Sequence, residues 1–323
     1  MPSEDRLSEE DFWGTPLQAA PRLLGQLLGL PAHGLRLWAP ETLALDARRS
    51  LPVHVGVFGD SVEVERLGFL DRTVVVAVDL ASGRTQAVRV GRSGGRDMLA
   101  PPPGFEGGLG PSAGARAARV ARFELWDAKA PVAWPAGRYR LTALAADLAS
   151  NDVLVELTRS VKTVDPALRE GDPPEAALPV WPAPDPAGGL PRYGATGGSL
   201  APPAEPGVVL AADRVATLRA GATCTLQGAV RAKRRDAYRA RHGAVIPVTL
   251  VITGTETPGP FVVPLRVPSF DRDGAAGDAE ISAHFAVDLL RLAELAALPQ
   301  TYLVHAFTAD GRTAPHPIAV VAE

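Results

Sequence analysis

Short runs rich in valine and leucine, each bounded by glycine, proline or aspartate, constrain this chain of 323 residues more than any other feature. Runs of this kind, separated by turn-forming residues, are typical of β-strands. Aromatic residues make up only 6% of the sequence, so valine, leucine and alanine must fill the core. We therefore expect an all-β fold. The expected strands before residue 166 are 51–59, 73–80, 86–91, 119–127, 137–148 and 151–161, and a similar series runs from Val215 to the C-terminus.

A proline-rich segment, residues 166–206, separates the two regions that carry this strand pattern. Its composition favours an extended linker or a strap along a surface, with a ligand for a proline-binding adaptor domain as the alternative. At ~100–200 residues per domain, the chain is long enough for two cores. We predict β-sandwich domains at 35–165 and 207–323, preceded by an N-terminal helical segment at 1–34.

Three sequence blocks occur in the same order in both regions, which predicts two tandem copies of one domain. Each block combines a strand-like run with a shared proline, phenylalanine or tyrosine. The aligned segments are 51–59 with 246–254, 123–127 with 285–288, and 134–143 with 298–306.

The third block carries an architectural resemblance. In each copy a proline comes shortly before a tyrosine, Tyr139 or Tyr302, and apolar residues follow the tyrosine. This arrangement resembles the tyrosine corner of Greek-key sandwiches of the immunoglobulin-like and fibronectin-III-like kind, where the tyrosine hydroxyl reaches back to an upstream backbone group. The resemblance implies two tandem Greek-key β-sandwich domains, and it carries no function.

Leucines recur at three- and four-residue steps between residues 15 and 30, which predicts a short amphipathic helix. Pro21 and Gly25 interrupt the pattern and Pro31 ends it. The helix either packs on the protein's own sandwich or docks on a protein partner, since both use this spacing. The candidate partner-binding leucines are Leu23, Leu24, Leu27 and Leu28.

A basic run at 231–242 is the second candidate partner-binding element. If the run were helical, Arg231, Arg235, Arg239 and His242 would share one stripe. We expect either a solvated insertion or a surface for an acidic protein. Because the net charge is −3 and we see no other basic stretch, nucleic acid is not an expected partner. The candidate residues are Arg231, Arg234, Arg235, Tyr238 and Arg239.

Four carboxylates lie in a glycine-containing segment, at Asp271, Asp273, Asp278 and Glu280. Oxygen-rich loops bind calcium, although the EF-hand spacing is not met. We expect a polar loop between strands, with a structural calcium ion at 271–280 as the alternative. No other cofactor is predicted.

The segment that ends in Gly59, Asp60 and Ser61 is similar to the strand-then-Gly-Asp-Ser block of SGNH-type esterases, in which the serine is the nucleophile. That family also needs an Asp-x-x-His motif near the C-terminus. Here Thr313 stands three residues before His316, and the family's oxyanion asparagine has a single candidate, Asn151. We therefore interpret Gly59 and Asp60 as a turn.

Histidine spacing predicts no zinc-protease motif. His284 and His305 fall on expected strands, where we expect either hydrogen-bonded interior residues or solvent-facing ones. Histidines from separate strands can still meet at a metal, so a metal-binding sandwich stays open.

The acidic N-terminal sequence has no secretory pattern, and no stretch approaches the ~20 apolar residues of a membrane span. A cytoplasmic protein is expected, with signal-independent export left open. One cysteine excludes an internal disulfide. The predicted function is a non-catalytic protein-interaction, scaffold or accessory module of a larger assembly. The alternatives are a serine hydrolase using Ser61 and a metal-binding β-sandwich.

Overall fold

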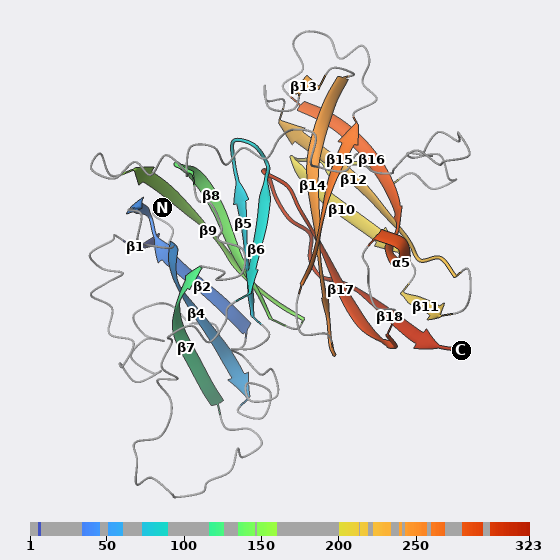
Figure 1. The fold of residues 1–323 in the computed structure, drawn as a ribbon, viewed down its shortest axis with the longest axis horizontal. Coiled ribbons are helices and arrows are strands. Elements are labelled where there is room, and N and C mark those ends of the chain that lie inside the picture. Colours follow the sequence, from blue (N-terminus) through green and yellow to red (C-terminus); the bar gives the residue numbers. More distant parts are fainter. Residues whose placement is uncertain are drawn as a thin grey trace, which may run out of the picture. The chain divides into compact units, whose positions relative to one another are not determined.

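The described elements are almost entirely β-strands, which confirms the all-β prediction (Figure 1). The one described helix is α5 (Leu289–Leu292), and no described helix has the length and apolar character to cross a membrane. The segment of the predicted N-terminal helix, and most of the proline-rich segment, lie outside the described residues. The computed structural model describes residues 6–7, 34–45, 51–60, 73–89, 116–125, 135–145, 147–159, 200–212, 214–218, 222–233, 239–240, 243–256, 260–268, 280–292 and 298–323.

Two sheets make up the N-terminal half of the molecule, which we define as strands β1 to β9. One sheet has the order β1-β2-β4-β7 and the other the order β3-β9-β8-β5-β6. The strands are β1 (Arg6–Leu7), β2 (Gly34–Pro40), β3 (Thr42–Leu45), β4 (Leu51–Asp60), β5 (Val74–Asp79), β6 (Thr85–Arg89), β7 (Arg116–Leu125), β8 (Gly137–Ala145) and β9 (Leu148–Arg159).

Two sheets also make up the C-terminal half, strands β10 to β18. One has the order β10-β12-β16, and the other has the order β11-β18-β17-β14-β13, with β15 also paired to β14. The strands are β10 (Gly207–Ala212), β11 (Val215–Leu218), β12 (Thr225–Lys233), β13 (Arg239–Ala240), β14 (Gly243–Gly254), β15 (Phe261–Pro268), β16 (Glu280–Asp288), β17 (Gln300–Phe307) and β18 (His316–Ala322).

The same strand order occurs in both halves. The order β2-β4-β7 corresponds to β10-β12-β16, and the order β3-β9-β8-β5-β6 corresponds to β11-β18-β17-β14-β15. In both halves one pair is parallel, β3 with β9 and β11 with β18. Chain contacts divide the molecule into two compact units, one of residues 1–77 and 87–171 and the other of residues 78–86 and 172–323.

This strand order corrects the first block of the sequence repeat. The sequence aligned 51–59, which lie in β4, with 246–254, which lie in β14. By position in the sheets, β4 corresponds to β12, and β14 corresponds to β5. The other two blocks align corresponding strands, β7 with β16 and β8 with β17. The alignment of the first block is wrong because buried central strands share the same Val- and Leu-rich composition, so composition alone does not identify which central strand a run forms.

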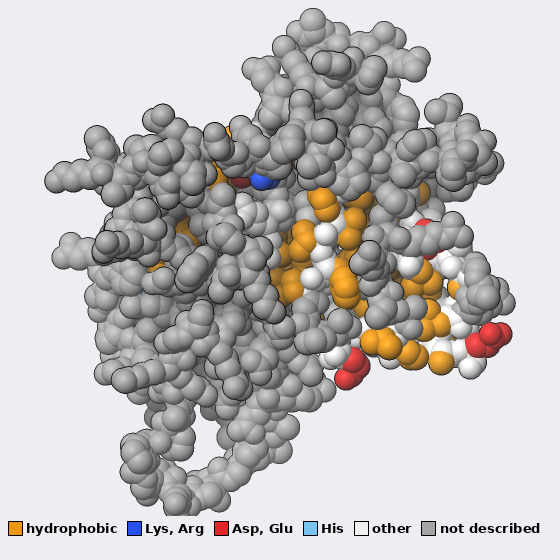
Figure 2. Space-filling view, in the orientation of Figure 1, with side chains coloured by type: hydrophobic (Ala, Val, Ile, Leu, Met, Phe, Trp, Pro, Cys, Tyr) orange, Lys and Arg blue, Asp and Glu red, His pale blue; other side chains and the backbone are white. Residues whose placement is uncertain are grey.

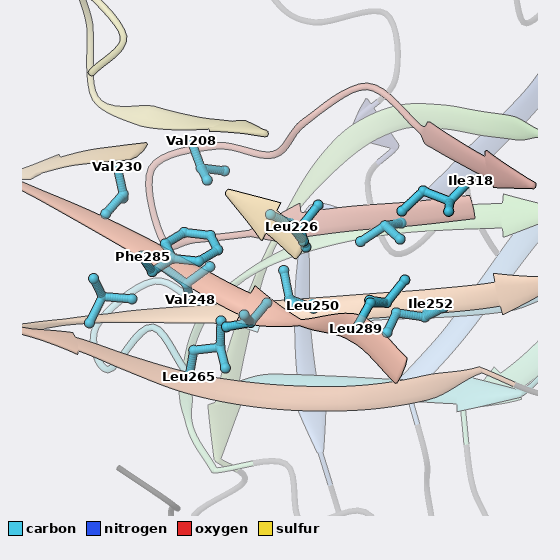
Figure 3. Packing of buried hydrophobic residues seen from close by; sticks show 14 of the residues in the cluster. Val208, Leu226, Val230, Val248, Leu250, Ile252, Leu265, Phe285, Leu289 and Ile318 are labelled. Carbon is cyan, nitrogen blue, oxygen red and sulfur yellow. The ribbon is translucent and has the colours of Figure 1, made fainter. Parts of the chain in front are cut away.

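Each half has its own buried apolar cluster between its two sheets. Residues of β2 and β4 meet residues of β5, β8 and β9 in the N-terminal half. In the C-terminal half, Figure 3 shows side chains of β10, β12, β14, β15, β16 and β18 converging, with Leu289 of α5 beside them. Alternation sets this pattern: on β16, every second residue from Ile281 to Val287 is buried. The ring of Phe285 occupies the space where Gly228 lacks a side chain.

Candidate interaction surface

The structure describes only part of the two predicted partner-binding segments. The four leucines of the N-terminal segment, and Arg234, Arg235 and Tyr238, lie outside the described residues. Arg231 lies on β12, half-buried, and its Nη1 donates to the carbonyl of Ala204 at 2.6 Å. Arg239 lies on β13. Because residues 231–233 and 239–240 belong to strands, the run is not one continuous helix, and the stripe that such a helix would give does not form.

The predicted calcium site is likewise mostly outside the described residues, which include Glu280 but not Asp271, Asp273 or Asp278. Glu280 is exposed at the start of β16. Within the described ranges, no group of three or more His, Cys, Asp or Glu side chains lies together as metal ligands would. The calcium site and the metal-binding function stay predictions.

Tyr139 and Tyr302 begin corresponding strands and bond in the same direction. The Tyr139 hydroxyl donates to the carbonyl of Pro135 at 2.9 Å, and the Tyr302 hydroxyl lies 3.5 Å from the carbonyl of Leu298. Both rings are buried. In each half, the hydroxyl thus fixes the strand start to the turn four residues upstream.

A second matched pair of bonds follows each tyrosine. The backbone N–H of Ala143 donates to the hydroxyl of Ser150 at 2.8 Å, and that of Ala306 donates to the hydroxyl of Thr313 at 3.0 Å. Each hydroxyl belongs to the residue eleven positions after the tyrosine, so alignment on the tyrosines would have revealed this pair in the sequence.

Asn151, the candidate oxyanion residue, takes part in a backbone bridge. Its Oδ1 accepts from the N–H of Leu37 at 2.9 Å, and its Nδ2 donates to the carbonyl of Leu37 at 3.0 Å. The side-chain amide thereby joins β9 of one sheet to β2 of the other. Ser61 lies outside the described residues, so the hydrolase alternative stays a prediction.

An apolar surface lies on the outer side of β11 and β18, and we call it the β11–β18 face. It consists of Val215, Thr217, Ala319 and Val321, in which Val215 pairs with Ala319 and Thr217 with Val321. Val215 is 59% exposed and Val321 is 41% exposed, whereas Ala216 and Val320 point to the core. Figure 2 shows hydrophobic side chains gathered on the described surface near the C-terminus. None of the four residues is charged.

Further along the same sheet, the outer side is buried. Leu303 and Phe307 of β17 are 7% and 1% exposed, and Val251 of β14, which pairs with His305, is fully buried. Among the described residues, the sheet therefore has buried apolar residues on both sides of β14 and β17, while Val215 and Val321 at its β11–β18 end and Val262 of β15 are exposed.

His305 lies in this buried part with its ring 6.2 Å from that of Phe307. Its imidazole is fully buried, and within the described residues neither ring nitrogen has a hydrogen-bond partner. Burial, with a smaller contribution from the Arg312 cation, lowers the pKa of His305 to about 4, while the backbone of Thr313 acts in the opposite direction. His305 is thus on a strand, as expected, and it is buried rather than solvent-facing. His284 is half-buried on β16.

Comparison with known proteins adds no assignment to these surfaces: no protein-family model matches the chain, and no curated protein matches it.

Proposed function

We propose that the two halves are tandem Greek-key β-sandwich domains of the immunoglobulin-like kind, and that the protein is a non-catalytic interaction module. Their shared strand order and the tyrosine bonds at the start of β8 and β17 support the domain assignment. In this proposal, the C-terminal domain binds a protein partner through the β11–β18 face.

The exposure of two neighbouring valines is the observation that carries this function. Single exposed apolar residues are ordinary on protein surfaces, whereas a contiguous apolar patch is typical of an interaction site. Val215 and Val321 lie on paired strands with Thr217 and Ala319 beside them. Full burial of a valine stabilises an interface by roughly 1.5–3 kcal/mol.

The chemistry of the face defines the partner. Because the four residues are apolar or hydroxyl-bearing, a charged partner surface would lose its hydration there without gaining an ion pair. The matching partner is a protein that presents an apolar, uncharged surface. Since β11 stands at the end of the strand order, such a partner can approach beyond the sheet margin as well as over the face.

Affinity capture with the full chain and charged variants tests this function. The variant V215D/V321D places two carboxylates on the face, and Thr225→Asp places one at an exposed position of β12 as the control. We expect the wild-type chain and the control to retain the same stoichiometric partner and V215D/V321D to lose it. Equal unfolding midpoints for the three proteins show that the substitutions act at the surface.

Two outcomes contradict the proposal. Retention of the partner by V215D/V321D would move the interface away from β11 and β18. Absence of any stoichiometric partner for the wild-type chain would contradict the interaction function itself.

A further inference from the structure

Strand β11 has backbone groups that point away from its neighbour β18. In the parallel pairing of these strands, the N–H of Ala319 donates to the carbonyl of Arg214 at 2.8 Å. Alternate residues of a strand bond the same neighbour, so the backbone groups of Ala216 also point to β18. The N–H and C=O groups of Val215 and Thr217 therefore point to the opposite side, along the open edge of the sheet.

This edge is accessible within the described part of the chain. Strand β11 stands at the end of the sheet order, and the described hydrogen bonds include none from the backbone of Val215 or Thr217. Val215 is 59% exposed, and Thr217 is exposed as well. Two N–H and two C=O groups thus lie beside the apolar β11–β18 face. An edge strand with such groups is a template for pairing with another strand.

The corresponding edge of the N-terminal half, strand β3, has the same backbone pattern but different side chains. The N–H of Glu156 donates to the carbonyl of Glu41 at 2.9 Å, which repeats the bond between β18 and β11. In the register of β3 and β9, Thr42 lies beside the exposed Glu156. The corresponding pair of β11 and β18 is Val215 with Ala319. Charges protect sheet edges from strand pairing, so the β11 edge is the less protected of the two.

Strand β15, which also pairs with β14, differs from β11 in another way. Its sequence contains two prolines, Pro264 and Pro268. A proline has no N–H to donate, and prolines on edge strands hinder the pairing of a further strand. The four residues of β11 include neither a proline nor a charge.

We propose that β11 accepts an extended segment of the partner protein as an additional antiparallel strand, a mode of binding that we call strand addition. It rests on the proposed function, because it assigns how the partner binds the β11–β18 face. The antiparallel direction is favoured because such pairs are slightly more stable per residue than parallel ones. In a hydrogen-bonded antiparallel pair, both side chains lie on the same side of the sheet. The partner residues that bond Val215 and Thr217 therefore lie beside them on the face, and they are apolar or hydroxyl-bearing and uncharged.

The dimensions of the edge favour an extended segment over a folded surface. The four residues of β11 span about 13 Å at ~3.3 Å per residue. A four-residue edge supplies only a fraction of the ~800 Å² that each partner buries in a typical interface between folded proteins. An added strand gains affinity from backbone hydrogen bonds instead, and its alternate side chains give specificity.

Peptide binding to the full chain tests strand addition. The probe is a fluorescent peptide, Gly-Ser-Val-Thr-Val-Thr-Val-Ser-Gly, and fluorescence anisotropy measures its Kd. Thr217→Pro removes an outward N–H of β11, and Ala44→Pro is the matched control at the corresponding position of β3. We expect binding to be at least tenfold weaker in Thr217→Pro and unchanged in Ala44→Pro. Equal Kd values for wild-type and Thr217→Pro, or no binding of the probe to the wild-type chain, would overturn strand addition.

A modified peptide keeps the proposal testable if Thr217→Pro does not fold. Methylation of the three valine nitrogens removes the donors that would bond β11 and leaves every side chain in place. The wild-type chain should bind this peptide at least tenfold more weakly than the unmodified one. Equal affinity for the two peptides would contradict strand addition, because side chains alone would then account for binding.

The variant V215D/V321D separates strand addition from the proposed function. If this variant loses the captured partner while the wild-type chain binds both peptides equally, strand addition is wrong and the interaction function of the face stands. If this variant retains the captured partner, the interface lies elsewhere and both proposals are wrong.

Discussion

The outer sides of the β1-β2-β4-β7 and β10-β12-β16 sheets differ, although the strand order β2-β4-β7 corresponds to β10-β12-β16. In the N-terminal half, β4 places His54 and Phe58 on the outer side, and both are buried. In the C-terminal half, the outer side of β12 is largely polar, with Gln227 and Arg231 half-buried and Lys233 exposed. The inner sides are alike, because both sheets pack on a partner sheet. The fold thus requires apolar residues on the inner side only, and the residue types on the outer side depend on what else contacts the sheet.

Truncation of one residue on each outer side gives the largest expected effect. Trp38→Ala removes a fully buried ring and should lower the free energy of unfolding of the N-terminal half by about 3–5 kcal/mol. Gln227→Ala, on the corresponding side of the C-terminal half, should change it by less than about 0.5 kcal/mol. Hydrogen exchange of β8 and β17 amides in urea measures the two halves separately. Equal losses of unfolding free energy in the two variants would contradict the difference between the buried outer side of the first sheet and the polar outer side of the second.

Acid should destabilise the C-terminal half through His305. The unfolded chain takes up a proton near the ordinary pKa of 6.5, whereas the folded chain does so only at about 4. The contribution of neutral His305 to the free energy of unfolding is therefore fully present above pH 6.5. It is lost as the pH drops from 6.5 to 4, by about 3 kcal/mol in total. The corresponding position of the N-terminal half is Thr142, which bonds Asp152 at 2.7 Å and does not titrate.

His305→Leu isolates this effect, with His284→Gln as the control. The slope of unfolding free energy of the C-terminal half between pH 4 and 6.5 should decrease in His305→Leu and persist in His284→Gln. An unchanged slope in His305→Leu would assign the acid sensitivity to other groups.

The smallest expected effects come from the two tyrosine hydroxyls. Tyr139→Phe removes a hydrogen bond of 2.9 Å and should cost about 1 kcal/mol, whereas Tyr302→Phe removes a contact of 3.5 Å and should cost less. Urea midpoints of the two halves measure both. A larger loss for Tyr302→Phe would show that its hydroxyl makes the stronger bond in solution.

Strands were predictable because burial in a sheet repeats every two residues. The expected strands 51–59 and 137–148 agree closely with β4 and β8. The place of a strand in its sheet was not predictable, since alternation carries no information about neighbours, and this misaligned 51–59 with 246–254. The state of His305 was also hidden, because its burial depends on the outer side of the sheet rather than on the pattern along β17.

The segments expected to bind partners were harder still to interpret. Leucine spacing predicts an apolar side but not what contacts it, and the basic run gives no sign that it includes parts of two strands. The β11–β18 face left no signal in the sequence. Val215 and Val321 resemble core valines, and only the strand pairing shows that they point outward.

The parallel pairing of β3 with β9 has a consequence for synthesis. Thr42 lies beside Glu156, so β3 lacks its partner until the chain has been made through most of β9. At ~5–20 residues per second, the ribosome needs roughly ten seconds to add the intervening residues. Although β3 is made early, it is thus among the last strands of the N-terminal half to complete its pairing, and during that interval its edge is open to other strands.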